Sequence, residues 1–168
     1  MPNWCQNEVT VYADTKGKLE QFKTFVKSTS DEDEFSFQSI SPVPSELTGT
    51  CSPTLICTDE EYHEWIREHQ PTYDFNDRPI TTLMSYRFKK QYGTDNWYDW
   101  CNSNWGTKWD VSHVESEQLD EQSIRYNFDT AWSPPEGIYD TLVDRFPELE
   151  ISWFYREEGM QFAGYLPN

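Results

Sequence analysis

The stretch from residue 124 to residue 146 reads IRYNFDTAWSPPEGIYDTLVDRF, and it sets the expected fold. Apolar and polar side chains alternate over residues 124–132, which predicts a strand with one buried face. Residues 133–136, Ser-Pro-Pro-Glu, are typical of a capping box with proline at the first helical position. The residues that then recur at helical spacing are Ile138, Leu142 and Phe146. A strand followed directly by a helix is therefore expected.

Further strands are expected on both sides of this unit. A period of two begins at Lys108, a loop at 115–122 turns the chain, and a hairpin is expected over 149–156 and 160–166. Near the N-terminus, alternation over residues 7–13 predicts another strand. The apolar residues that predict a helix over 17–28 are Leu19, Phe22 and Val26, and those that predict a strand after it are Phe35, Phe37 and Ile40.

The middle of the chain, about residues 45–107, has a mostly helical pattern. Thr58 and Glu61 form a capping box that starts one helix, which Pro71 ends. A second helix is expected from Ile80 to about Tyr92, and a short third one from Asp95.

The expected order is therefore β-α-β, a helical insertion, and β-β-α-β-β. It predicts an α+β fold with a ferredoxin-like antiparallel sheet, helices packed on one face and the insertion after the second strand. We expect one domain, residues 1–168, with the insertion at about 45–107.

The charge of the chain limits its partners. Its 168 residues include 30 acidic and 13 basic ones, for a net charge of −17, and residues 109–168 hold 13 of the acids but only 3 of the bases. Such a surface repels phosphates and membrane headgroups and attracts basic proteins. Direct binding to nucleic acid or membranes is therefore disfavoured. Solubility alone is the simpler explanation of this acidity.

No sequence pattern predicts an enzyme, a cofactor or a metal. Phosphate-binding glycine loops and a nucleophile elbow are missing from the sequence. The candidate metal ligands are Cys51, Cys57, His63 and His69, and each is six residues from the next. Zinc ligands are usually paired at a spacing of two to four residues, so this spacing argues against a zinc site. Without a signal peptide, a membrane-length segment or a CxxC pair, we expect a cytoplasmic protein with reduced thiols.

Half of the eight tryptophans lie in residues 96–111, NWYDWCNSNWGTKWDV. They are Trp97, Trp100, Trp105 and Trp109. Trp97 and Trp100 have helical spacing, and Trp109 is expected on the inward side of the next strand. This pattern predicts an aromatic staple that docks the insertion onto the sheet. The alternative is an aromatic pocket that stacks a ligand ring.

Three motifs carry a resemblance to a known family. The motifs are MPNWC at residues 1–5, WGTKWD at 105–110 and DTAWSPP at 129–135. The chain resembles the ferredoxin-like-domain family of uncharacterised phage, prophage and plasmid proteins over nearly its full length. The resemblance implies the same fold, an origin in a mobile element and accessory work against a bacterial host, including evasion of its defences. The family offers no catalytic residues to transfer.

Two functions follow as expectations. The first is a non-enzymatic acidic interaction protein that inhibits a basic host protein, such as a defence nuclease or another nucleic-acid-binding protein, by mimicking nucleic-acid charge. The second is a small-molecule or nucleotide binder, or an enzyme, that uses the aromatic pocket between insertion and sheet. A phosphorylated ligand would require four cations to gather there: Arg78, Arg87, Lys89 and Lys90.

The first function predicts acids gathered at the ends of the sheet. In a ferredoxin-like layout, six acids are expected at one end: Asp31, Glu32, Asp33, Glu34, Glu157 and Glu158. Four more are expected at the opposite end: Glu115, Glu117, Asp120 and Glu121. These ten residues are the predicted contacts of the basic partner.

Overall fold

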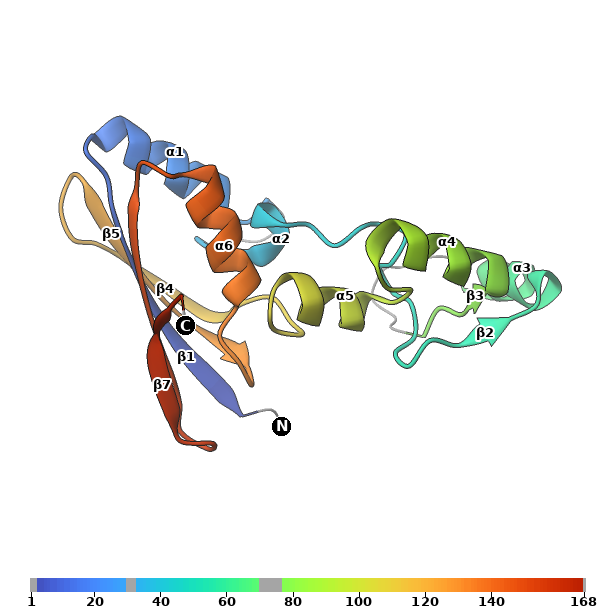
Figure 1. Ribbon diagram of the computed structural model, residues 1–168. Helices are drawn as coiled ribbons and strands as arrows, with labels where there is room; N and C mark the ends of the chain where they lie inside the picture. Colours follow the sequence, from blue (N-terminus) through green and yellow to red (C-terminus); the bar gives the residue numbers. More distant parts are fainter. Residues whose placement is uncertain (1–2, 30–32, 70–76, 168) are drawn as a thin grey trace. The chain divides into compact units, whose positions relative to one another are not determined.

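The computed structural model describes residues 3–29, 33–69 and 77–167 (Figure 1). The chain divides into two compact units. The first contains residues 1–42 and 104–168, and the second contains residues 43–103. No helix among the described residues is both long and apolar enough to cross a membrane.

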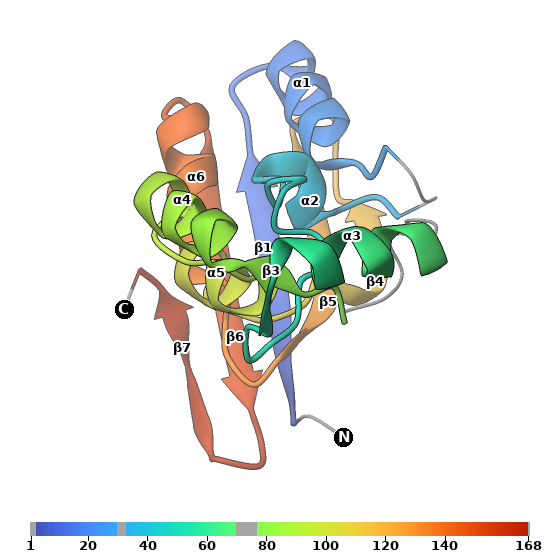
Figure 2. The ribbon, with the colours of Figure 1, turned by 90° about the vertical axis from the view of Figure 1, so that its right-hand side faces the viewer.

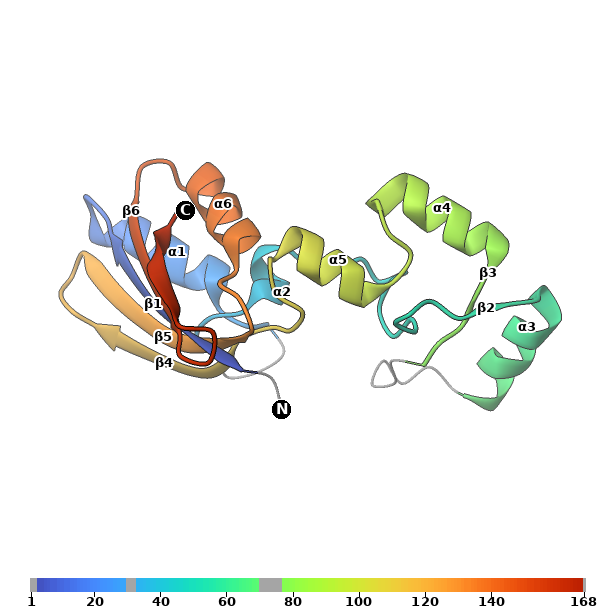
Figure 3. The same ribbon diagram turned by 60° about the horizontal axis from the view of Figure 1, so that its bottom comes forward.

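The first unit is built on a five-stranded antiparallel sheet with the strand order β4-β5-β1-β6-β7. Its strands are β1 (Trp4–Tyr12), β4 (Ser112–Gln118), β5 (Ser123–Ala131), β6 (Glu150–Glu157) and β7 (Phe162–Leu166). Its helices are α1 (Lys16–Val26), α2 (Phe37–Ile40) and α6 (Glu136–Arg145). Figure 3 shows α1 and α6 on the same side of this sheet.

This connectivity confirms the predicted ferredoxin-like α+β fold. The helix α1 follows β1, and the chain reaches β4 after α2 and the second unit, whereas α6 connects β5 to β6 directly. The two strand–helix–strand units interleave in the strand order β4-β5-β1-β6. The hairpin partner β7 extends the sheet beyond β6.

The predicted strand around residues 35–40 is wrong. Phe35 is buried and α2 begins at Phe37, because Asp110 accepts hydrogen bonds from the amides that start this helix. As a result, the second strand of the fold is β4, and residues 43–103 precede it rather than follow it. That strand begins at Ser112, four residues later than the sequence pattern suggested.

The core of the first unit is largely aromatic. Trp153 is fully buried, and its ring makes edge contacts with Phe35, Phe128 and Tyr139 at centroid distances of 6.2, 5.6 and 6.1 Å. Its Nε1 donates to Oδ1 of buried Asn7 at 3.0 Å. The alternation predicted for residues 124–131 is observed, since Ile124, Tyr126 and Phe128 of β5 are buried. Few but large side chains therefore fill this core.

The second unit contains short elements around a two-stranded parallel sheet. These are β2 (Ile56–Cys57), α3 (Asp59–Glu68), β3 (Ile80–Thr81), α4 (Thr82–Tyr92) and most of α5 (Trp97–Asn104). Figure 2 shows β3 between α3 and α4. The capping box at Thr58 and Glu61 is confirmed, as is the expected helix after Ile80.

The buried carboxylate of Asp95 organises this second unit. It accepts hydrogen bonds from Thr54 at 2.6 Å and Ser85 at 2.5 Å, and it pairs with Lys89 at 2.9 Å. Burial by itself would raise the pKa of Asp95. The hydrogen bonds and the charge of Lys89 outweigh burial, so the pKa falls from 3.8 to about 2. The ionised carboxylate therefore stabilises the fold.

We expect the second unit to lose stability as the pH falls through this pKa. Because the folded pKa of Asp95 lies below its unfolded value, its stabilisation is complete above about pH 4 and disappears toward pH 2. The amount is about 2 kcal/mol, since one pKa unit corresponds to about 1.4 kcal/mol. Urea unfolding across this window, compared with Asp95→Asn, measures it. An equal pH dependence of the parent and the variant would contradict the assignment.

Candidate functional site: an acid-lined hollow on the open sheet face

Within the described part of the first unit, no helix packs on one face of the five-stranded sheet, and we call this face the open face. Along β1, Cys5, Asn7 and Val9 are buried on the helix side, whereas Gln6 and Glu8 are exposed on the other side. The same alternation in the neighbouring strands gives the open face a mixed, largely polar surface.

Strand register places two rows of side chains side by side on the open face. In one row, Glu115 of β4 pairs with Asn127 of β5, which pairs with Glu8 of β1 and then Phe154 of β6. In the next row, the residues in register are Asp129, Gln6 and Arg156. Carboxylates thus gather on the β4–β5–β1 side, and an aromatic ring and a guanidinium lie on β6.

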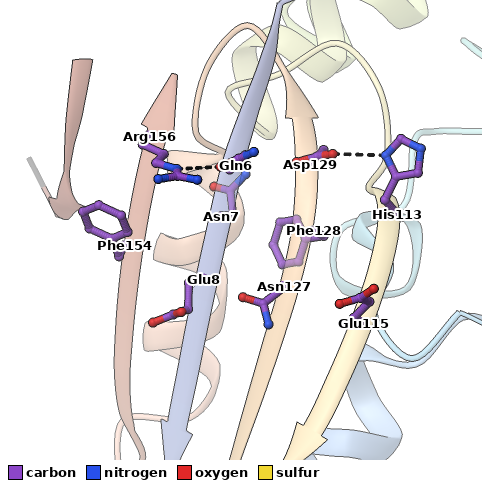
Figure 4. A pocket seen from close by; sticks show the side chains of 10 residues that line it. All are labelled: Gln6, Asn7, Glu8, His113, Glu115, Asn127, Phe128, Asp129, Phe154 and Arg156. Carbon is purple, nitrogen blue, oxygen red and sulfur yellow. Dashed lines mark hydrogen bonds and ion pairs between the residues drawn. The ribbon is translucent and has the colours of Figure 1, made fainter. Parts of the chain in front are cut away.

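These rows surround a hollow of about 480 Å³ (Figure 4). Three carboxylates line it, those of Glu8, Glu115 and Asp129. The other lining residues are Gln6, Asn7, His113, Asn127, Phe128, Phe154 and Arg156. With three acids against one arginine, the hollow is suited to a cationic group such as a lysine or arginine side chain.

A bulge in β4 shapes one wall of the hollow. The register shifts between Ser112 and Glu115, and His113 has a positive φ of 54°. Its Nδ1 lies 3.0 Å from Oδ2 of Asp129, and its ring lies edge-on to Trp4 at 6.0 Å. Bulges of this kind redirect a side chain and bend the strand. The imidazole therefore stands beside the carboxylates of the hollow.

Two arginines partly neutralise the open face. Arg125 lies between two acids, 4.0 Å from Glu8 and 3.8 Å from Glu117. Arg156 Nε donates to Oε1 of Gln6 at 2.5 Å, and its guanidinium lies 3.9 Å from Glu158. These long, exposed ion pairs contribute little stability each. A better-placed cation from a partner can therefore replace them at low cost.

Four of the ten predicted partner contacts lie in β4 or in the turn after it. Glu115 lines it, Glu117 shares its face, and Asp120 and Glu121 lie in the turn between β4 and β5. Asp120 is held by the turn, because its carboxylate accepts from the Gln122 amide at 2.7 Å; this bond lowers its pKa.

The predicted contacts at the other end differ in exposure. Asp31 and Glu32 lie outside the described residues. Asp33 is exposed, Glu34 pairs with Lys27 at 2.7 Å, and Glu158 is exposed in the β6–β7 turn. No described contact joins these acids into one surface. The open face, rather than this end, has the carboxylates that line a common hollow.

The expectation that Glu157 is a surface acid is wrong. It is 2% exposed, and its carboxylate accepts hydrogen bonds from the backbone amides of Gly159 and Met160. A Cβ at residue 159 would lie 2.3 Å from Nδ2 of Asn3, so a larger residue there requires the Asn3 side chain to move. Glu157 therefore holds the β6–β7 turn and is not available to a partner.

The four tryptophans do not have one common environment. Trp97 is partly buried and Trp100 is 7% exposed in the second unit, whereas Trp105 is 4% exposed in the first. Trp109 is 40% exposed, with Lys108 Nζ 3.9 Å from its ring, so its predicted inward position is wrong. The local cause is that residues 108–111 are not a strand.

The segment WGTKWD at residues 105–110 has a structural role. Asp110 accepts from Phe37 N at 2.6 Å and Gln38 N at 3.1 Å, and Trp105 Nε1 donates to the Ser41 carbonyl at 2.8 Å. The short helix α2 is therefore capped at both ends by this motif.

The segment DTAWSPP at residues 129–135 is hydrogen-bonded to the segment at 105–110. The Ser133 hydroxyl donates to the Gly106 carbonyl at 2.6 Å instead of capping α6, so the expected capping box at residues 133–136 is wrong. Thr107 donates to the Ala131 carbonyl at 2.9 Å. Both motifs thus join segments of the first unit.

Removal of the Asp110 cap is expected to destabilise the first unit. Asp110→Ala leaves the first amides of α2 without their charged acceptor, and the loss is about 2 kcal/mol for hydrogen bonds to a carboxylate. Urea unfolding measures it, with exposed Asp33→Ala as the control. Equal midpoints for the two variants would refute a capping role for Asp110.

The described residues contain no cluster of three or more histidine, cysteine or acidic side chains placed to hold a metal. Two of the four cations required by a phosphorylated ligand have other partners. Lys89 pairs with Asp95, and Arg78 donates to the backbone carbonyls of Glu46 and Thr48.

The fold and the open face define a ferredoxin-like α+β protein with an acid-lined sheet. Residues 104–167 match the model of a family described as the ferredoxin-like domain in Api92-like protein. The crystal structure of a protein api92 from Yersinia pseudotuberculosis is similar over 98% of this chain and 93% of that chain, with 13% identity and a TM-score of 0.55. At this identity the similarity shows the fold alone. No curated protein matches the sequence.

Proposed function

We propose that this protein is a non-enzymatic acidic interaction protein of a phage or other mobile element. It acts in the cytoplasm of the bacterial host, where its open face binds a basic, nucleic-acid-binding protein, such as a defence nuclease. The carboxylates take the place of phosphates and thereby inhibit the partner.

The observation that carries this proposal is the convergence of Glu8, Glu115 and Asp129 on one hollow. They belong to three adjacent strands of one sheet, in which positions on neighbouring strands lie about 5 Å apart within a row, and successive rows lie about 7 Å apart along the strands. Such a frame presents charges with little loss of conformational entropy on binding. A basic groove that binds phosphates at similar spacing is a suitable partner.

The wider charge distribution supports the same function. The first unit, which contains the open face, has 20 acidic and 8 basic residues, so it holds −12 of the total charge of −17. A field of this sign accelerates encounter with a basic protein and repels nucleic acid. It favours a protein partner over direct binding to DNA or RNA.

The test is affinity capture from nuclease-treated bacterial lysate at low and high salt. The proposal predicts a basic, nucleic-acid-binding protein that is retained at low salt and released at high salt, because the contact is mainly electrostatic. Retention of an acidic partner, or of any partner without salt sensitivity, would contradict it.

A further inference from the structure

The two edges of the five-stranded sheet are protected very differently. The β4 edge carries Glu115 and Glu117 and is interrupted by the bulge at His113. The β7 edge reads FAGYL and has no charged residue, in a chain with a net charge of −17. Proteins usually protect an exposed strand edge with charges, bulges or proline. Here β4 is protected in two of these ways, and no charge or bulge protects β7.

The outer edge of β7 is free among the described residues. Among the described residues it pairs only with β6, and Figure 2 shows no other strand or helix of the first unit along it. Tyr165 is 62% exposed and Ala163 is also exposed. In an antiparallel strand, every second residue directs both its N–H and its C=O away from the paired neighbour. The edge therefore presents unpaired backbone groups between uncharged side chains.

We propose that β7 is a dimerisation edge, where β7 of a second copy adds in antiparallel orientation about a two-fold axis. A second copy fits best because an acidic chain repels itself wherever its charges meet, and β7 is a strand without charge. Backbone hydrogen bonds and apolar side-chain pairs then join the two sheets. This inference does not depend on the proposed function.

The sequence of β7 fits its own two-fold image. Only the register centred on Gly164 pairs all five residues, and it places Ala163 opposite Tyr165 of the second copy and Phe162 opposite Leu166. The Phe162–Leu166 pair is apolar, and the Ala163–Tyr165 pair places a small side chain beside an aromatic ring; Gly164 lies opposite its own copy. No like charges oppose each other in this register.

The dimer joins the two sheets into one continuous sheet. The two open faces then lie on the same surface, because antiparallel pairing about an axis perpendicular to the sheet preserves the side of each face. Two acid-lined hollows therefore point toward the same side of the dimer. A partner with two basic sites can contact both hollows at once.

The test is the mass of the full chain by sedimentation at increasing concentration. We expect a shift from one chain to two. The double variant Ala163→Glu, Tyr165→Glu should remain monomeric where the parent is dimeric, because like charges then face each other. The control Gln21→Glu, Ser116→Glu adds the same charge at exposed positions away from β7 and should still dimerise. Melting curves establish that the variants are folded.

Complementary charges give a decisive second measurement. The variant Ala163→Lys, Tyr165→Lys should also be monomeric alone, but mixing it with the double glutamate variant should restore a dimer containing one copy of each, measured by native mass spectrometry. A parent that remains monomeric at every concentration would overturn the proposal. Persistence of the dimer in the folded glutamate variant would overturn it as well.

Discussion

Trp153→Ala is expected to cost the first unit about 3–5 kcal/mol of unfolding free energy, the range for a buried large aromatic side chain. The indole is fully buried and contacts three other aromatic rings. Its loss leaves a cavity and also deprives Asn7 Oδ1 of its donor at a buried position. Because domains are stable by only about 5–15 kcal/mol, the variant should be largely unfolded at moderately raised temperature.

Urea unfolding followed by far-ultraviolet circular dichroism measures this loss. Trp109→Ala is the matched control, since the same atoms are removed from a side chain that is 40% exposed. Its cost should be below about 1.5 kcal/mol. Similar midpoints for the two variants would show that Trp153 does not anchor the core.

Neutralising the hollow is expected to weaken partner binding about 100-fold without unfolding the protein. In the triple variant Glu8→Gln, Glu115→Gln, Asp129→Asn, each side chain keeps its size and loses its charge. If each carboxylate contributes about 1 kcal/mol to binding a cation, the three together contribute about 3 kcal/mol. Isothermal titration with the captured partner measures this change.

The control for the hollow removes equal charge from the other side of the sheet. Asp140→Asn, Asp144→Asn, Glu148→Gln alters exposed residues on α6 or just after it. We expect this control to lower the affinity by less than about threefold, through long-range attraction alone. Equal losses for the two triple variants would mean that overall charge, and not the open face, drives binding.

Local sequence patterns predicted the elements whose contacts are local. The strand over 124–131 and the capping box at Thr58 both depend on residues that are close together in the sequence, and both are present. The strand predicted at residues 35–40 is not observed, and the reason is a contact with a residue far away in the sequence. Its helical form depends on Asp110, 73 positions from Phe37 in the sequence. Alternation of apolar and polar residues in a short segment gives no information about a cap from a distant residue.

The candidate site depended on strand register, which a single sequence does not provide. Glu115 was identified as an acid of a loop, but its neighbours Glu8 and Asp129 were missed because they are far apart in the chain. Alternation could have placed Glu8 and Asp129 on the solvent side of their strands, opposite buried Val9 and Phe128. It could not have shown that the strands are adjacent. The surface position predicted for Glu157 is wrong because its carboxylate accepts a backbone hydrogen bond in the β6–β7 turn, which the sequence does not reveal.

Carboxyl footprinting of the captured complex tests the central claim most directly. In this measurement, a carbodiimide labels exposed carboxylates, and mass spectrometry reads the modification of each residue in the free and bound protein. We predict that labelling of Glu8, Glu115 and Asp129 falls severalfold on binding, while Asp144 on the opposite side of the sheet is labelled equally in both states. Unchanged labelling of the three hollow acids in a complex that has formed would contradict the assignment of the open face as the binding surface.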